Sequence, residues 1–125
     1  RSDINLNLYT MDDIRKFGLN NIIETIINNI NNSNIDGVHL SFDIDALDKR
    51  LVPGTGTPVE NGFNLDEGKE LFSKFIGAGF ITSMHFVELN PLLDDVDNKT
   101  VKNCLELLKH IFSVLKTQNK LTIGI

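Results

Sequence analysis

The sequence predicts an α/β fold with a mainly parallel sheet, in a three-layer α-β-α arrangement. Segments with strand patterns alternate along the chain with segments of helical pattern. This order favours right-handed crossovers between parallel strands. The run at residues 38–42 is short, mostly apolar and followed by an acidic loop, which is typical of a strand buried in a parallel sheet. A length of 125 residues suits one domain.

The N-terminal third is expected to hold one strand and two helices. Apolar and polar residues alternate over Ile4–Tyr9, and a period of two predicts a strand. Thr10 and Asp13 form a pattern like a capping box, so a short helix should run to Phe17. Apolar residues at helical spacing over residues 19–30 predict a second helix, which a cluster of asparagines should end.

The rest of the chain is expected to alternate between loop, helix and strand. Proline and glycine are dense over residues 46–62, which predicts a loop, and a loop this long is usually functional. Asn64 and Glu67 form a second pattern like a capping box, ahead of a helix expected over residues 65–76. A strand is expected over residues 80–87, an amphipathic helix over 101–115 and an apolar-ended tail over 120–125.

Composition excludes several classes of function. The chain is 41% hydrophobic, with a net charge of −5, so it has no electrostatic footprint for nucleic acid. No apolar run approaches the ~20 residues of a membrane span. The single cysteine, Cys104, cannot form an internal disulfide and favours a reducing compartment; we expect it to be a buried, inert thiol. The chain starts at Arg1 and has few strands, so we expect the remainder of the same polypeptide to complete it.

The sharpest chemical feature is the segment at residues 41–45, which reads Ser-Phe-Asp-Ile-Asp. Side chains two residues apart in an extended chain point to the same side, so Asp43 and Asp45 should project together from the carboxyl end of a strand. Open α/β sheets bind ligands at that end. The two carboxylates repel each other, and a divalent cation such as Mg²⁺ or Mn²⁺ removes that cost. The alternative is an acidic turn in solvent.

Two further segments are expected to lie near these aspartates. Residues 53–58 read Pro-Gly-Thr-Gly-Thr-Pro, where glycines allow backbone to approach a ligand and prolines stiffen the loop; a plain structural turn is the alternative. Glu88 begins the segment Glu-Leu-Asn-Pro at the end of a strand and should face the same rim as Asp43 and Asp45. Its carboxylate can bind a guanidinium through two parallel hydrogen bonds, or it simply faces solvent.

Together these segments closely resemble the arginase family of ureohydrolases. The resemblance covers roughly residues 36–91, and residues 9–18 are similar to the stretch that precedes the motif in arginases. The Gly-Gly-Asp-His and Asp-x-His-x-Asp segments of the family are missing from this chain. The resemblance therefore implies that residues 1–125 are the C-terminal part of a single arginase-like catalytic domain. Lys49 stands where many family members have proline, a loop change that leaves the candidate ligands intact.

The resemblance also implies roles for four residues. Asp43 would bridge two Mn²⁺ ions and Asp45 would bind one of them, with the remaining ligands upstream of this chain. A metal-bridging hydroxide would attack the guanidinium carbon of L-arginine and yield L-ornithine and urea. Glu88 would bind the guanidinium group, and Thr57 would line the same pocket. Asp43, Asp45 and Glu88 are thus the expected catalytic residues.

Other interpretations within and beyond this superfamily stay open. Agmatinase and formiminoglutamase share the Asp-x-Asp and Gly-Thr-Pro segments. A ureohydrolase-like subunit without activity is a non-enzymatic alternative. The family resemblance implies a homo-oligomer, typically a trimer or a hexamer and here expected to be a trimer, and a cytoplasmic location with mitochondria as the alternative.

Three histidines and an acidic cluster receive structural interpretations. His39 lies four positions before Asp43 and should face the same side of the predicted strand. It either hydrogen-bonds a metal ligand or, as we prefer, is an ordinary sheet histidine. His85 and His110 are expected to be structural or exposed. The acidic cluster at residues 94–97 is explained by the N-terminus of the following helix.

Overall fold

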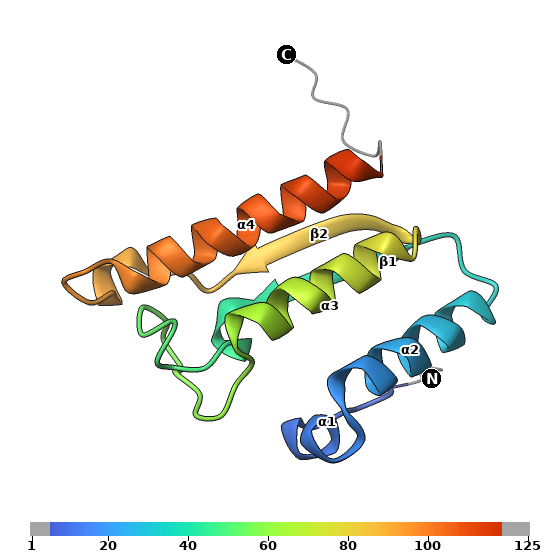
Figure 1. Cartoon of the computed structure of the whole chain (residues 1–125), viewed down its shortest axis with the longest axis horizontal. Coiled ribbons are helices and arrows are strands. Elements are labelled where there is room, and N and C mark those ends of the chain that lie inside the picture. The colour runs from blue at the N-terminus through green and yellow to red at the C-terminus, as the bar shows by residue number, and fades with distance from the viewer. Residues whose placement is uncertain (1–5, 119–125) are drawn as a thin grey trace, which may run out of the picture.

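The computed structural model describes residues 6–118. The helices and strands of this part (Figure 1) are α1 (Met11–Phe17), α2 (Leu19–Asn31), β1 (Val38–Asp43), α3 (Leu65–Gly77), β2 (Ile81–Val87) and α4 (Lys99–Thr117), with short 3-10 helices η1 (Ile44–Ala46) and η2 (Pro91–Leu93). The expected helices are confirmed to within two residues at each end. The expected tail at residues 120–125 lies outside the described residues.

Local sequence signals explain where the helices begin. The Thr10 hydroxyl accepts a hydrogen bond from the Asp13 N–H, and the Asp13 carboxylate accepts one from the Thr10 N–H. Asn64 and Glu67 form the same reciprocal pair at the start of α3. Each pair satisfies backbone donors that the first helical turn leaves free. Both predicted capping boxes are therefore confirmed.

The two strands run parallel and define the edge on which the candidate site lies. β1 pairs with β2 so that Phe42 lies opposite Phe86 and Asp43 opposite Val87. α3 connects the two strands as a crossover helix, as parallel pairing requires. The expected α/β class with a parallel sheet is thus confirmed. Because the register ends with Asp43 and Val87, the residues that follow the two strands begin side by side.

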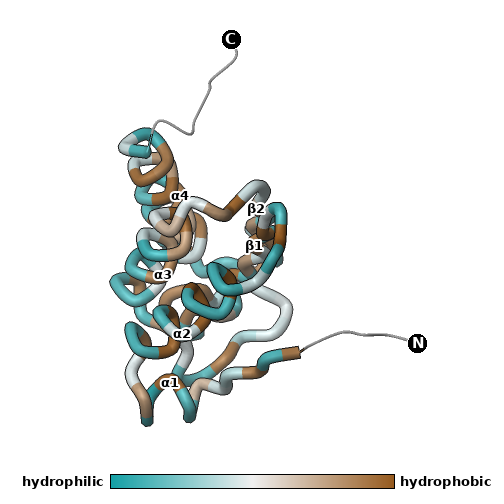
Figure 2. The backbone as a smooth tube through the Cα atoms, turned by 90° about the vertical axis from the view of Figure 1, so that its right-hand side faces the viewer, coloured by the Kyte–Doolittle hydropathy of each residue, from teal (hydrophilic) through white to brown (hydrophobic). Residues whose placement is uncertain are grey.

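The helices lie on one side of the sheet. In Figure 2 the helical column stands to the left and β1 and β2 stand to the right. Consecutive helices pack on one another, α1 on α2, α2 on α3 and α3 on α4. Phe42 faces this layer, with its ring centroid 4.8 Å from that of buried Phe72 on α3. Within residues 6–118 the opposite face of β1 exposes the polar His39 and Ser41.

The strand predicted over Ile4–Tyr9 is wrong in the part that the structure describes. Residues 4 and 5 lie outside the described residues, and residues 6–10 form no strand. Leu6 and Leu8 are 81% and 76% exposed. A strand needs a partner for its backbone hydrogen bonds, and none of the described β-pairings involves residues 6–10.

No helix in the described range combines the length and apolarity that crossing a bilayer requires.

Candidate functional site

Asp43 and Asp45 are brought together by a turn rather than by a shared strand face. Asp43 is the last residue of β1, but Asp45 already lies in η1. The Asp43 Oδ1 atom accepts a hydrogen bond of 3.1 Å from the Asp45 N–H and caps this 3-10 turn. The expectation that Asp43 and Asp45 point to the same side of one extended strand is therefore wrong, because the strand ends at Asp43. The predicted proximity of the two side chains holds for a different reason.

The carboxylates of Asp45 and Glu88 lie close enough to Asp43 to affect its pKa. Burial raises the pKa of Asp43 above its ordinary value, against the opposing hydrogen bond from the Asp45 N–H. The neighbouring carboxylates of Asp45 and Glu88 raise this pKa further. Like charges held together in this way favour either protonation or a bound cation. The rim formed by Asp43, Asp45 and Glu88 is thus acidic, as the sequence predicted.

Glu88 reaches this rim through an unusual backbone conformation. It follows the last residue of β2, which lies opposite Asp43 in the sheet register. Its φ of +73° is in the left-handed region that non-glycine residues rarely occupy. Glu88 is exposed, so its carboxylate is open to a ligand. Strained residues of this kind occur often at ligand sites.

Thr57 lies on the loop between η1 and α3 and contacts the site directly. Its hydroxyl donates a hydrogen bond to the Oδ2 atom of Asp45 at 2.5 Å. The contact links residues 12 positions apart, so the loop folds back over the turn that carries Asp45. The sequence placed Thr57 near the site only through the family resemblance, and it did not predict this hydrogen bond. Thr57 orients one candidate metal ligand.

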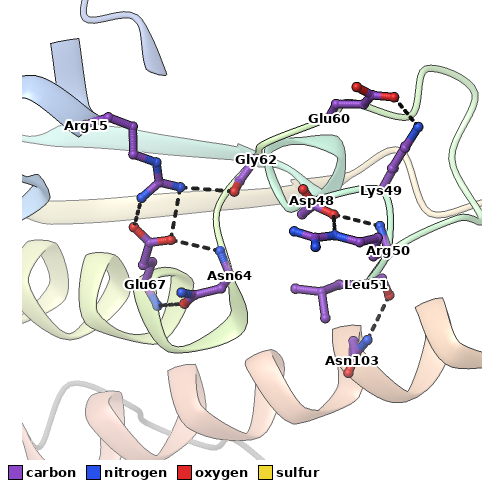
Figure 3. A network of polar contacts seen from close by, with 10 residues as sticks. All are labelled: Arg15, Asp48, Lys49, Arg50, Leu51, Glu60, Gly62, Asn64, Glu67 and Asn103. Atoms are coloured by element: carbon purple, nitrogen blue, oxygen red, sulfur yellow. Dashed lines mark hydrogen bonds and ion pairs between the residues drawn. The ribbon is translucent and has the colours of Figure 1, made fainter. Parts of the chain in front are cut away.

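The far end of this loop is held by hydrogen bonds beside the same turn. The Phe63 N–H donates to the Ala46 carbonyl at 2.8 Å, and the Asp48 N–H donates to the Phe63 carbonyl at 2.9 Å. The Arg15 guanidinium of α1 donates to the Gly62 carbonyl at 3.2 Å and to Glu67 of α3 (Figure 3). α1 therefore helps to hold the loop where it returns to the residues after Asp45.

Two ion pairs lie at the start of the loop. Hydrogen bonds from the side chain and N–H of Arg50 lower the pKa of Asp48 to about 2. Lys49, the departure from the family pattern, forms an ion pair with Glu60 across the loop (Figure 3). The carboxylates of Asp48 and Glu60 are thus paired with basic side chains, so neither belongs to the acidic rim.

The three histidines and the cysteine form packing contacts and hydrogen bonds within the fold. His39 hydrogen-bonds Ser83 through its Nδ1 atom at 2.6 Å and packs edge-on against His85. His110 hydrogen-bonds Ser73 between α4 and α3 at 2.6 Å. Cys104 is buried, and burial raises the pKa of its thiol to about 11. His39 is thus a sheet histidine, and Cys104 is the inert thiol that the sequence predicted.

One acidic residue has a role that the sequence identified only in outline. Asp94 accepts hydrogen bonds from the N–H groups of Thr100 and Val101, both at 3.0 Å, at the start of α4. Burial opposes ionisation of Asp94, but these bonds and one from the Thr100 hydroxyl hold its pKa below the ordinary value. Asp94 therefore caps α4 although it lies six positions before Thr100, and no short sequence motif predicts a cap at that spacing.

The donor set at the rim fits part of a divalent metal site. Asp43 and Asp45 present carboxylate oxygens, the ligands that Mn²⁺ and Mg²⁺ prefer, and a cation would relieve the repulsion on Asp43. Within residues 6–118, no group of three or more His, Cys, Asp or Glu side chains is placed to hold a metal ion. The two aspartates thus supply some ligands of such a site and leave others to be supplied from elsewhere.

Comparison with known proteins agrees with this geometry. The model of the arginase family matches residues 1–113. An arginase of Staphylococcus aureus is 40% identical over 110 residues, and one of Bacillus subtilis is 42% identical over 106 residues. These alignments cover 88% and 85% of this chain but only 36% and 35% of the relatives. The chain therefore spans about a third of the length of the relatives that it matches.

Solved structures place the fold in the same group. The crystal structure of the Bacillus subtilis arginase matches with a TM-score of 0.77 and 40% identity, over 85% of this chain and 37% of that one. The formimidoylglutamase of Bacillus subtilis matches with a TM-score of 0.81 and 28% identity, over 90% of this chain and 34% of that one. On the family match and these relatives, the chain belongs to the arginase family.

Proposed function

We propose that this chain is the C-terminal part of a manganese-dependent arginase, which hydrolyses L-arginine to L-ornithine and urea. The observation that carries the proposal is the placement of Asp43, Asp45 and Glu88 at the adjacent carboxyl ends of the parallel strands β1 and β2. Sequence relatives that are named arginases support the choice of reaction. The proposal covers the whole protein, because this chain spans only a third of those relatives.

Each of the four candidate residues has a role that its position allows. Asp43 and Asp45 would hold Mn²⁺, which when bound makes hydroxide available near neutral pH. The exposed Glu88 carboxylate would accept paired hydrogen bonds from the substrate guanidinium and fix its orientation. The Thr57 hydroxyl holds the Asp45 carboxylate in place through its hydrogen bond to Oδ2. The other metal ligands would come from the remainder of the polypeptide, and we expect a homotrimer.

A second candidate reaction has one specific observation in its favour. The formimidoylglutamase match has a TM-score of 0.81, against 0.77 for the Bacillus subtilis arginase. The carboxylate rim suits any cationic amidine or guanidine, because it recognises the planar nitrogen group and not the rest of the substrate. Arginine is preferred here because the sequence identity to arginases is higher, 40% against 28%.

Purified full-length protein, loaded with Mn²⁺ and assayed on several substrates, tests the proposal. We expect urea release from L-arginine and a kcat/KM well above the values for agmatine and for formimidoylglutamate. Replacement of Glu88 by Gln should lower kcat/KM by about 100-fold or more, because a site built to bind a charged group loses its partner. Glu24→Gln on the exposed side of α2 is the matched control and should match the unsubstituted enzyme.

Two results would overturn the assignment. Faster turnover of agmatine or formimidoylglutamate would move the protein to another ureohydrolase activity. Failure of the Mn²⁺-loaded protein to act on any of the three substrates would favour the subunit without activity.

A further inference from the structure

The loop that carries Thr57 and the strand end that carries Glu88 meet at Gly54. The Gly54 carbonyl accepts a hydrogen bond of 2.9 Å from the N–H of Asn90, two residues after Glu88. A Cβ atom at Gly54 would lie 3.1 Å from the Asn90 carbonyl oxygen, so the two backbones touch. This contact limits the spacing between the two segments, because Thr57 is only three positions from Gly54 and Glu88 only two positions from Asn90.

A threonine of α4 completes this junction. The Gly54 N–H donates a buried hydrogen bond of 2.7 Å to the Thr100 hydroxyl oxygen. Thr100 has no exposed surface, and its own N–H is held by the Asp94 carboxylate at 3.0 Å. The Gly54 carbonyl is thus bound to the segment after Glu88, and the Gly54 N–H is bound to α4. Without Thr100, its buried N–H would have no acceptor.

α4 supplies a rigid support for this contact. It is 19 residues long and packs along α3. One turn beyond Thr100, the Asn103 side-chain amide donates to the Leu51 carbonyl at 2.7 Å (Figure 3). Thr100 and Asn103 are three positions apart, so they lie on the same face of the helix and hold the loop at two points. Only the Thr100 contact also reaches the segment that follows Glu88.

We propose that Thr100 is a positioning residue that sets the distance between Thr57 and Glu88 by clamping Gly54 between α4 and the end of β2. The proposal rests on the function proposed above, because it assigns both residues to one substrate site. Misplacement of a binding group by about 1 Å can cost about 100-fold in rate. Loss of the hydroxyl at residue 100 should therefore lower activity although this residue does not touch the substrate.

Two substitutions at one position separate positioning from folding. Thr100→Val keeps the shape of the side chain and removes the hydroxyl, whereas Thr100→Ser keeps the hydroxyl and removes a methyl group. In the full-length Mn²⁺-loaded protein, we expect Thr100→Val to lower kcat/KM for L-arginine by about 10-fold or more. Thr100→Ser should stay within about threefold of the unsubstituted enzyme. Thr117→Val removes an exposed hydroxyl at the other end of α4 and is the matched control.

The assay is run at a temperature where circular dichroism shows all variants fully folded. A Thr100→Val variant that is folded and as active as Thr100→Ser would overturn the proposal. A Thr100→Ser variant as impaired as Thr100→Val would also overturn it, since the methyl group would then matter and not the hydroxyl. An inactive unsubstituted enzyme would instead refute the proposed function. If another ureohydrolase substrate is preferred, the same comparison is made with that substrate.

Discussion

Gly62 lies where the returning loop touches the residues that follow Asp45. A Cβ atom at this position would lie 2.7 Å from the Ala46 carbonyl oxygen, and equally close to backbone atoms of Leu47 and Asp48. Real side chains do not approach backbone this closely, so any larger residue must push the loop away. The hydrogen bonds of Phe63 to the same segment depend on this close approach. A single glycine thus sets how tightly the loop closes beside the turn that carries Asp45.

Replacement of Gly62 by Ala should destabilise the protein by about 1–3 kcal/mol through overpacking against backbone. Gly56→Ala is the matched control, because a Cβ atom at Gly56 would meet nothing within 4 Å. The control should change stability by less than about 0.5 kcal/mol. Denaturant titration of both full-length variants measures the difference. Equal stability of the two variants would contradict the close packing at Gly62.

At the scale of elements, the junction of α1 and α3 controls the other end of the loop. Glu67 both completes the capping box of α3 and pairs with Arg15 of α1. Its side chain is 18% exposed, against 49% for Arg15. Burial raises the pKa of Glu67, but the Arg15 guanidinium and the Asn64 N–H outweigh burial and leave this pKa below its ordinary value. One carboxylate therefore joins two helices that the loop separates.

Two substitutions of Glu67 should separate its two functions. Glu67→Gln keeps a capping oxygen and loses the ion pair, which should cost up to about 1 kcal/mol, since Arg15 is half exposed. Glu67→Ala should cost about 1 kcal/mol more through the lost cap. Because the folded-state pKa of Glu67 is lowered, its contribution is present above the ordinary value of 4.5 and is lost as pH falls through the folded pKa. Denaturant titrations should show a smaller Glu67→Gln deficit at pH 3 than at pH 7.

At the scale of the molecule, the described residues form part of an α/β layer structure. Its sheet consists of β1 and β2, and the helices that the structure describes lie on one side of it (Figure 2). Two-stranded sheets are marginal without further packing, and unpaired strand edges invite association. The buried hydroxyl of Thr55 has no hydrogen-bond partner within residues 6–118. These features agree with a fold that further chain completes.

Residues 1–125 expressed alone should release no urea from L-arginine with Mn²⁺. The physical reason is that two aspartates leave most of the coordination shell of the metal unfilled. The full-length protein at the same concentration is the control and should be active. Urea release by the 125-residue chain itself would refute the proposal that this chain is only part of the enzyme.

Much of the site followed from local sequence patterns. The apolar run before Asp43 and the strand before Glu88 put both carboxylates at the carboxyl edge of a parallel pair, as the register confirms. The capping boxes and apolar stripes predicted every described α-helix, because helix hydrogen bonds join residues close in sequence. The strand predicted over residues 4–9 was wrong for residues 6–9, the part that the structure describes, since strand hydrogen bonds need a partner that periodicity does not reveal.

The sequence by itself determined the α/β class, the helix starts and the candidate residues of the rim. Only the tertiary structure showed that Asp45 lies in a 3-10 turn, that Thr57 holds it, and that Gly54 joins α4 to the segment after Glu88. The bonds of Thr57 and Gly54 link residues 12 to 46 positions apart. No short-range pattern specifies such pairs, because they form only when separate elements pack together.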